Sequence, residues 1–167
     1  MSYKKSFIIV AVTFLLQPLF SSMIPVLWKL DFMACFAFVC TLVYRHDDVV
    51  PPIVASLVFT FLKDLYIGQF VGSGVIGLLA VIGFALAIKR VVNIDNQFIV
   101  GAVTVAAIVV NKVVIWIVGR AFASPYTFGY AMSFMPKIVI VNLIASMILY
   151  AILINKIIND RRDRYFR

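Results

Sequence analysis

The stretch FLKDLYIGQFVGSGVIGLLAVIG, from Phe61 to Gly83, decides the fold class of this chain. It begins with an apolar run that ends in the pair Lys63-Asp64, passes through a glycine-rich turn and enters a second apolar run. In a chain that is 64% hydrophobic, this order predicts a helical hairpin that crosses a membrane, with a charged pair near its tip.

The composition of the whole chain agrees with this interpretation. Soluble domains are about half apolar, and a core built from 167 residues cannot hide this much apolar surface from water. The basic residues behind the net charge of +8 lie in short clusters between apolar runs and at both ends, not on one soluble face, so we expect no nucleic-acid partner. The basic, apolar N-terminus lacks a small-residue cleavage site and is interpreted as an uncleaved first helix.

We therefore predict an all-α polytopic membrane protein with six transmembrane helices, at roughly residues 7–24, 30–44, 51–66, 73–88, 98–118 and 136–157. The second helix is short for about 30 Å of hydrocarbon, so it either begins earlier, near Val26, or is shielded by its neighbours. Pro18 should kink the first helix, and Gln17 either donates to a neighbouring helix or satisfies a carbonyl that the proline frees. The aromatic segment 119–135 is predicted as a loop at the membrane interface.

The distribution of lysine and arginine orients these six spans. Ten basic residues fall on the side of the termini: Lys4, Lys5, Arg45, Lys89, Arg90, Lys156, Arg161, Arg162, Arg164 and Arg167. Four fall on the other side (Lys29, Lys63, Arg120, Lys137), and Lys112 lies within a helix. By the positive-inside rule both termini are cytoplasmic and the hairpin tip is external. The basic C-terminal tail either rests on anionic lipid or docks a cytoplasmic partner.

No catalytic constellation is present in the sequence. The chain has no glutamate, its one histidine lies in a polar loop, and no phosphate-binding or dinucleotide motif occurs. Cys35 and Cys40 share one apolar run and are interpreted as small buried residues, not as metal ligands or a disulfide. We expect no enzymatic activity, no cofactor and no metal site.

The candidate functional residues are polar or small residues within or beside the spans. Because an unpaired charge at membrane depth costs about 2.5–3.5 kcal/mol, we hypothesise that Asp64 pairs with Lys112 or Arg120. The alternatives are that Asp64 faces headgroups and water and that Lys112 snorkels outward alone. Small residues allow close helix packing, which we expect at Gly77 and Gly83, whereas Gly68 belongs to the turn. The full candidate set for helix packing or partner binding is Gln17, Asp64, Gly68, Gly74, Gly77, Gly83, Asn111, Lys112, Arg120 and Asn142.

The order and spacing of several short motifs resemble the bacterial rod shape-determining MreD family over most of the length. The motifs are Leu16-Gln17, Leu30-Asp31-Phe32, then Asp64 followed by Gly68, Gly74 and Gly77, and finally Pro136 and Asn142. One departure is that the third helix lacks a glycine several residues before the aspartate, where Ser56 or Thr60 is the nearest small residue.

This resemblance implies a non-enzymatic scaffold of the cell-elongation machinery. Its expected partner is an MreC-like bitopic membrane protein, with the MreB filament and the RodA/penicillin-binding protein synthase engaged indirectly, and a homodimer is left open. The alternative is a substrate-binding subunit of an energy-coupling-factor vitamin transporter, which also has six helices. Against that alternative, the first helix lacks a small-residue docking face and the external side lacks an obvious cluster of polar ligand groups.

Overall fold

The computed structural model describes residues 3–44, 46–67, 70–91, 96–122, 124, 125 and 127–165, and within these ranges it contains helices and no strand. The elements are α1 (Tyr3–Met23), the 3₁₀ helix η1 (Pro25–Lys29), α2 (Phe32–Val43), α3 (His46–Ile67), α4 (Ser73–Ile88), α5 (Gln97–Ala121), α6 (Phe128–Ser133) and α7 (Met135–Tyr165). The predicted all-α fold class is therefore confirmed.

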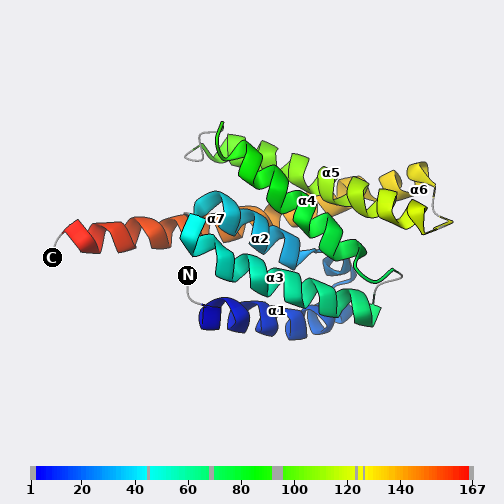
Figure 1. Cartoon of the computed structure of the whole chain (residues 1–167), viewed down its shortest axis with the longest axis horizontal. Helices are drawn as coiled ribbons and strands as arrows, with labels where there is room; N and C mark the ends of the chain where they lie inside the picture. Colours follow the sequence, from blue (N-terminus) through cyan, green and yellow to red (C-terminus); the bar gives the residue numbers. More distant parts are fainter. Residues whose placement is uncertain are drawn as a thin grey trace.

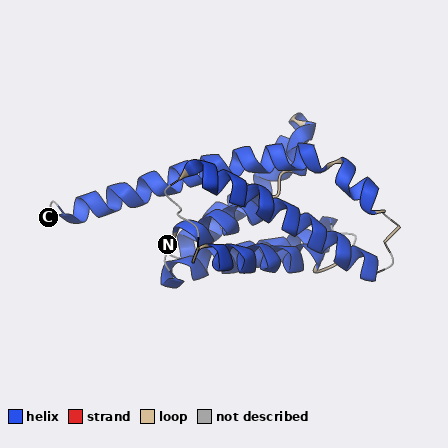
Figure 2. Ribbon diagram, turned by 90° about the horizontal axis from the view of Figure 1, so that it is seen from above, coloured by secondary structure: helices blue, strands red, loops and turns tan. Residues whose placement is uncertain are grey.

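The long helices run back and forth along one axis and form an elongated bundle (Figure 1). The start of α1 and the end of α7 lie at the same end of the molecule, and α7 projects beyond the other helices there (Figure 2). The opposite end, here called the distal end, carries η1, the α3–α4 turn and α6 (Figure 1).

Three helical segments are long and apolar enough to cross a membrane: Asp48–Tyr66 in α3, Gln97–Ala121 in α5 and Met135–Asn155 in α7. The apolar helices α2 and α4 are shorter, with 12 and 16 residues. By the length and composition of these helices, the chain is suited to a membrane.

The short helix α2 lies in the middle of the bundle. Every residue from Met33 to Leu42 is buried, and α2 packs against α3, α4 and α7. Twelve residues of α-helix span only about 18 Å, so both ends of α2 stop inside the bundle. Of the two explanations for its shortness, shielding by neighbouring helices is the one observed, because Val26 belongs to η1 and not to α2.

Several helix bounds differ from the sequence prediction. α3 begins at His46 and contains Pro51 and Pro52, so the prolines lie inside the helix and do not open it. α6 occupies part of the segment predicted as a loop, and α7 continues to Tyr165, beyond the predicted end at 157. Only α4 has the predicted bounds, since Gly72 with its φ of 90° marks its start.

Candidate functional site

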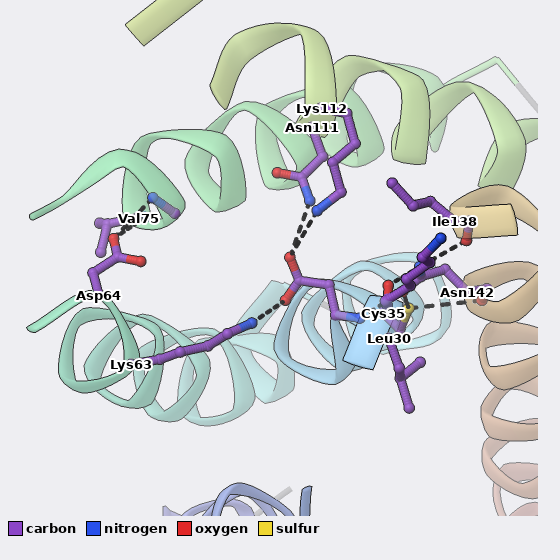
Figure 3. Close-up of polar contacts among 12 residues, drawn as sticks. Leu30, Cys35, Lys63, Asp64, Val75, Asn111, Lys112, Ile138 and Asn142 are labelled. Carbon is purple, nitrogen blue, oxygen red and sulfur yellow. Dashed lines mark hydrogen bonds and ion pairs between the residues drawn. The ribbon is translucent and has the colours of Figure 1, made fainter. Parts of the chain in front are cut away.

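Polar side chains gather at the N-terminus of α2, around Asp31. Lys63 Nζ of α3 lies 3.5 Å from Asp31 Oδ1, and Lys112 Nζ of α5 lies 3.7 Å from Oδ2. Asn111 Nδ2, also of α5, donates to Oδ2 over 3.4 Å. Figure 3 shows these three side chains converging from two helices on one carboxylate. The position suits an acid, because the N-terminus of a helix carries partial positive charge.

The cluster carries more positive than negative charge. Asp31 is shared by two ammonium groups, so its one carboxylate leaves one positive charge uncompensated within the cluster. The side chains of Lys63, Lys112 and Asp31 remain 30%, 26% and 17% exposed. Partly hydrated pairs of this kind contribute at most about 1 kcal/mol each.

Asn142 of α7 fixes the backbone on either side of Leu30. Its Oδ1 accepts from the Asp31 backbone N–H at 2.7 Å and from the Cys35 thiol at 3.2 Å. Its Nδ2 donates to the carbonyl oxygens of Lys29 at 2.9 Å and Ile138 at 2.8 Å. The side chain is only 2% exposed. This one amide therefore ties α7 to the entry of α2 and uses both its donors and its acceptor.

Gln17 adds the fourth helix. Its Nε2 donates to the Leu30 carbonyl oxygen at 2.7 Å, so of the two alternatives the link to another part of the chain is the one observed. The three residues Lys29, Leu30 and Asp31, here called the Asp31 junction, thus receive side chains from α1, α3, α5 and α7. Four helices are joined through these three consecutive residues, two of them at backbone groups and two at the Asp31 carboxylate.

Asp64 closes the α3–α4 hairpin. Its Oδ2 accepts from the backbone N–H groups of Gly74 at 2.8 Å and Val75 at 3.3 Å (Figure 3). Gly72, the residue before α4, offers no side-chain acceptor, so Asp64 caps this helix from α3. A Cβ atom on Gly74 would lie 2.5 Å from Asp64 Oδ1, so any larger residue there would force the Asp64 carboxylate to shift.

The hypothesised pair of Asp64 with Lys112 or Arg120 is wrong. Lys112 pairs with Asp31, and Arg120 Nη1 donates to the Ser124 carbonyl oxygen at 3.2 Å. The unbonded N–H groups in the first turn of α4 are strong donors close to Asp64. A comparison of side-chain charges alone does not include such backbone donors.

Two glycines of α4 differ in their surroundings. A Cβ atom on Gly77 would lie 2.8 Å from Ile115 Cγ1 and would also overlap Asn111 Oδ1, so α4 and α5 approach closely there. Gly83 has no described atom within 4 Å of such a Cβ, and the packing expected for it is absent within the described chain. Gly68 lies outside the described residues.

At the other end of α2, the side chain of Lys89 contacts the last carbonyl groups of the helix. Lys89 Nζ, just after α4, donates to the carbonyl oxygens of Thr41, at 2.7 Å, and Tyr44. A cation suits this position, because the C-terminus of a helix carries partial negative charge. Burial lowers the pKa of the Lys89 ammonium group. Sequence analysis assigned Lys89 only a topological role, and Asp31 only a place in a motif.

Two hollows adjoin the Asp31 cluster. One, of about 20 Å³, is lined by Asp31, Asn111, Lys112, Asn142 and Ser146, among others. The second, of about 340 Å³, lies next to α6 at the distal end. Lys112 belongs to the lining of both.

The arrangement as a whole holds helix ends together. Within the described ranges no group of three or more histidine, cysteine or acidic residues is placed to bind a metal ion. Cys35 and Cys40 are free and buried, as expected. Comparisons of the chain with protein-family models, with curated proteins and with solved structures found no match.

Proposed function

We propose that the chain is a multi-pass protein of the bacterial cell membrane that crosses it six times, with both termini in the cytoplasm. Three long apolar helices, two shorter ones and the ten-to-four distribution of basic residues support this topology. The short helix α2 fits such a membrane domain because its neighbours cover it from lipid. The distal end then faces the outside of the cell.

The function we propose is that of a scaffold without catalytic activity in the cell-elongation complex, similar to the MreD family. One observation carries this proposal: the residues of the motifs that resemble this family are those that hold the helices together. Gln17, Asp31 and Asn142 meet at the Asp31 junction, and Asp64 with Gly74 closes the hairpin. These polar groups are engaged in helix-to-helix contacts, which is what a scaffold requires of them.

In this proposal the chain binds an MreC-like bitopic partner through its helices and external loops. Through that partner it acts indirectly with the MreB filament and the RodA/penicillin-binding protein synthase. The basic C-terminal tail rests on anionic lipid of the cytoplasmic leaflet. As an alternative, the same helices and loops bind a second copy of the chain and form a homodimer.

The structure changes where the partner contact should be tested. Asp64 and Gly77 are occupied by contacts within the chain, whereas Gly83 lies on an open face of α4. A glycine on such a face lets a partner helix approach closely. We therefore place a photo-crosslinking residue at Gly83 and, as a buried control, at Ala85, which is 0% exposed.

The expected result is that Gly83 captures a co-expressed MreC-like protein in native membranes and Ala85 does not. Co-purification of the two proteins from detergent provides a second measurement. Absence of the partner from both experiments would contradict the scaffold function. Thermal stabilisation of the purified chain by a member of a vitamin panel would favour the energy-coupling-factor transporter instead.

A further inference from the structure

The larger pocket has the dimensions of a binding site. Its volume of about 340 Å³ falls within the range of about 300–1,000 Å³ that is typical of small-molecule sites. Residues of α5, α6 and α7 and the start of α4 contribute to its wall. The lining residues that decide its chemistry are Lys112, Ile115, Trp116, Tyr130, Met132 and Ile138.

The helix α6 forms one side of this pocket. It is attached near both ends: the ring of Phe128 lies 5.1 Å from that of Trp116, and Lys29 Nζ lies 4.8 Å from the ring of Phe134. Between these contacts, Tyr130 and Met132 line the pocket. No residue of α6 is buried. The short helix thus borders the hollow and has an aromatic contact near each of its ends.

The charge of the pocket favours an anion. Lys112 is the charged residue in its lining, and it shares the carboxylate of Asp31 with Lys63, which leaves one positive charge uncompensated. An acidic group near Lys112 would compensate that charge in surroundings where apolar walls weaken the screening by water. The remaining wall, with Ile115 and Ile138, suits an apolar portion of the same ligand.

The setting of the pocket indicates where such a ligand comes from. Phe122, Phe128 and Tyr130 are 62%, 49% and 53% exposed at this end of the chain. Exposed aromatic side chains of this kind are typical of the membrane–water interface. Molecules that reach the pocket sideways at this level are membrane lipids.

We propose that the pocket under α6 binds the headgroup of an anionic phospholipid, with the phosphate against Lys112 and the adjoining glycerol and acyl carbons against the apolar wall. The proposal rests on the membrane placement given under the proposed function. It does not depend on the identity of the protein partner.

The test measures lipid affinity of the purified full-length chain in detergent by native mass spectrometry. The probes are dioleoylphosphatidylglycerol and, as a zwitterionic lipid of the same chain length, dioleoylphosphatidylcholine. We expect Lys112→Met to raise the Kd for the anionic lipid about tenfold and to change that for the zwitterionic lipid much less, because its choline cation offsets the charge of its phosphate. The matched control is Lys137→Met, because it removes an exposed positive charge at the start of α7 but neither lines the pocket nor pairs with Asp31.

Equal losses in the two variants, or no loss in either, would overturn the proposal, as would equal binding of the two lipids by the unaltered chain. A second variant, Ala131→Trp, fills the pocket from α6 without touching the charge cluster, and it should also weaken binding of the anionic lipid. Unchanged binding in this variant would place the lipid elsewhere.

Two further measurements distinguish an error in the lipid-binding proposal from an error in the proposed scaffold function. If soluble glycerol phosphate or a vitamin stabilises the chain as much as the anionic lipid does, the ligand is not a lipid. If lipid binding fails while an MreC-like protein still co-purifies, only the pocket proposal is wrong. If the partner is lost while lipid binding keeps its dependence on Lys112, only the proposed function is wrong.

Discussion

The two ends of the central helix α2 are held by different means. At the distal end the Asp31 junction receives side chains from α1, α3, α5 and α7. At the other end the described contact is that of Lys89, which donates to the last carbonyl groups of α2. Both ends follow the helix dipole, with an acid at the N-terminus and a base at the C-terminus.

The two ends of α2 therefore have different structural roles, although each places a charge that suits the helix dipole. Lys89 caps one helix and links it to one neighbour. The Asp31 junction precedes the same helix and contacts four others, α1, α3, α5 and α7. A change at the distal end should therefore affect several helix contacts together, and a change at the opposite end should have local effects.

The largest effect is expected at Asn142. Asn142→Leu removes the acceptor of the Asp31 N–H and the donor to the Lys29 carbonyl and leaves both backbone groups, which are partly buried, without that partner. We expect a loss of about 3 kcal/mol in the free energy of unfolding, measured by denaturant titration in detergent. The control Ile144→Leu changes a side chain that is 55% exposed. Equal stability of the two variants would show that the hydrogen bonds of Asn142 at the Asp31 junction do not stabilise the fold.

A smaller effect is expected from alanine in place of the glycines of α4. Gly74→Ala and Gly77→Ala place a Cβ against Asp64 and Ile115 and should each cost about 1–3 kcal/mol. Gly83→Ala is the matched control, since its Cβ meets no described atom and alanine favours a helix by about 1 kcal/mol. Thermal unfolding of the three variants tests whether close packing is confined to the distal half of α4.

Lys89→Met tests the opposite end of α2. It removes the donor to the carbonyl groups of Thr41 and Tyr44, and we expect a loss of about 1–2 kcal/mol. The matched control is Arg90→Met, which removes an adjacent positive charge that is exposed to solvent. A loss as large as that of Asn142→Leu would show that the two ends of α2 are equally important.

The smallest effect concerns the ion pair of Asp31 with Lys112. A double-mutant cycle with Asp31→Asn and Lys112→Met should give a coupling energy of about 0.5–1 kcal/mol, since both side chains remain partly hydrated. The same cycle with Asp64→Asn and Lys112→Met should be additive, because Asp64 binds the backbone of α4. Coupling in the second cycle and none in the first would show that Lys112 pairs with Asp64 and not with Asp31.

The sequence predicted what depends on local pattern. Apolar runs placed the long helices, and Gly72 marked the start of α4, whose bounds match. The predicted start of α3, at Pro51, was too late, because a helix tolerates proline near its first turns and this one begins at His46. The six residues of α6 were missed because they are too few to show a helical period.

The site was harder to predict because its partners are far apart in sequence. Asp31 bonds to groups on residues 63, 111, 112 and 142, and no local pattern connects these positions. The signal that could have revealed it is an acid directly before an apolar helix, where the helix dipole favours negative charge. Lys89 follows α4 in the sequence but donates to the end of α2, so no local signal indicated its contact.

The central claim is that the Asp31 junction couples four helices while Lys89 caps one. Backbone hydrogen exchange of Asn142→Leu and Lys89→Met in lipid nanodiscs tests it most directly. We predict that Asn142→Leu raises exchange at the distal ends of α1, α3, α5 and α7 together, and that Lys89→Met raises it only where α2 ends and α4 meets it. Exchange that rises in α7 alone after Asn142→Leu would contradict the claim.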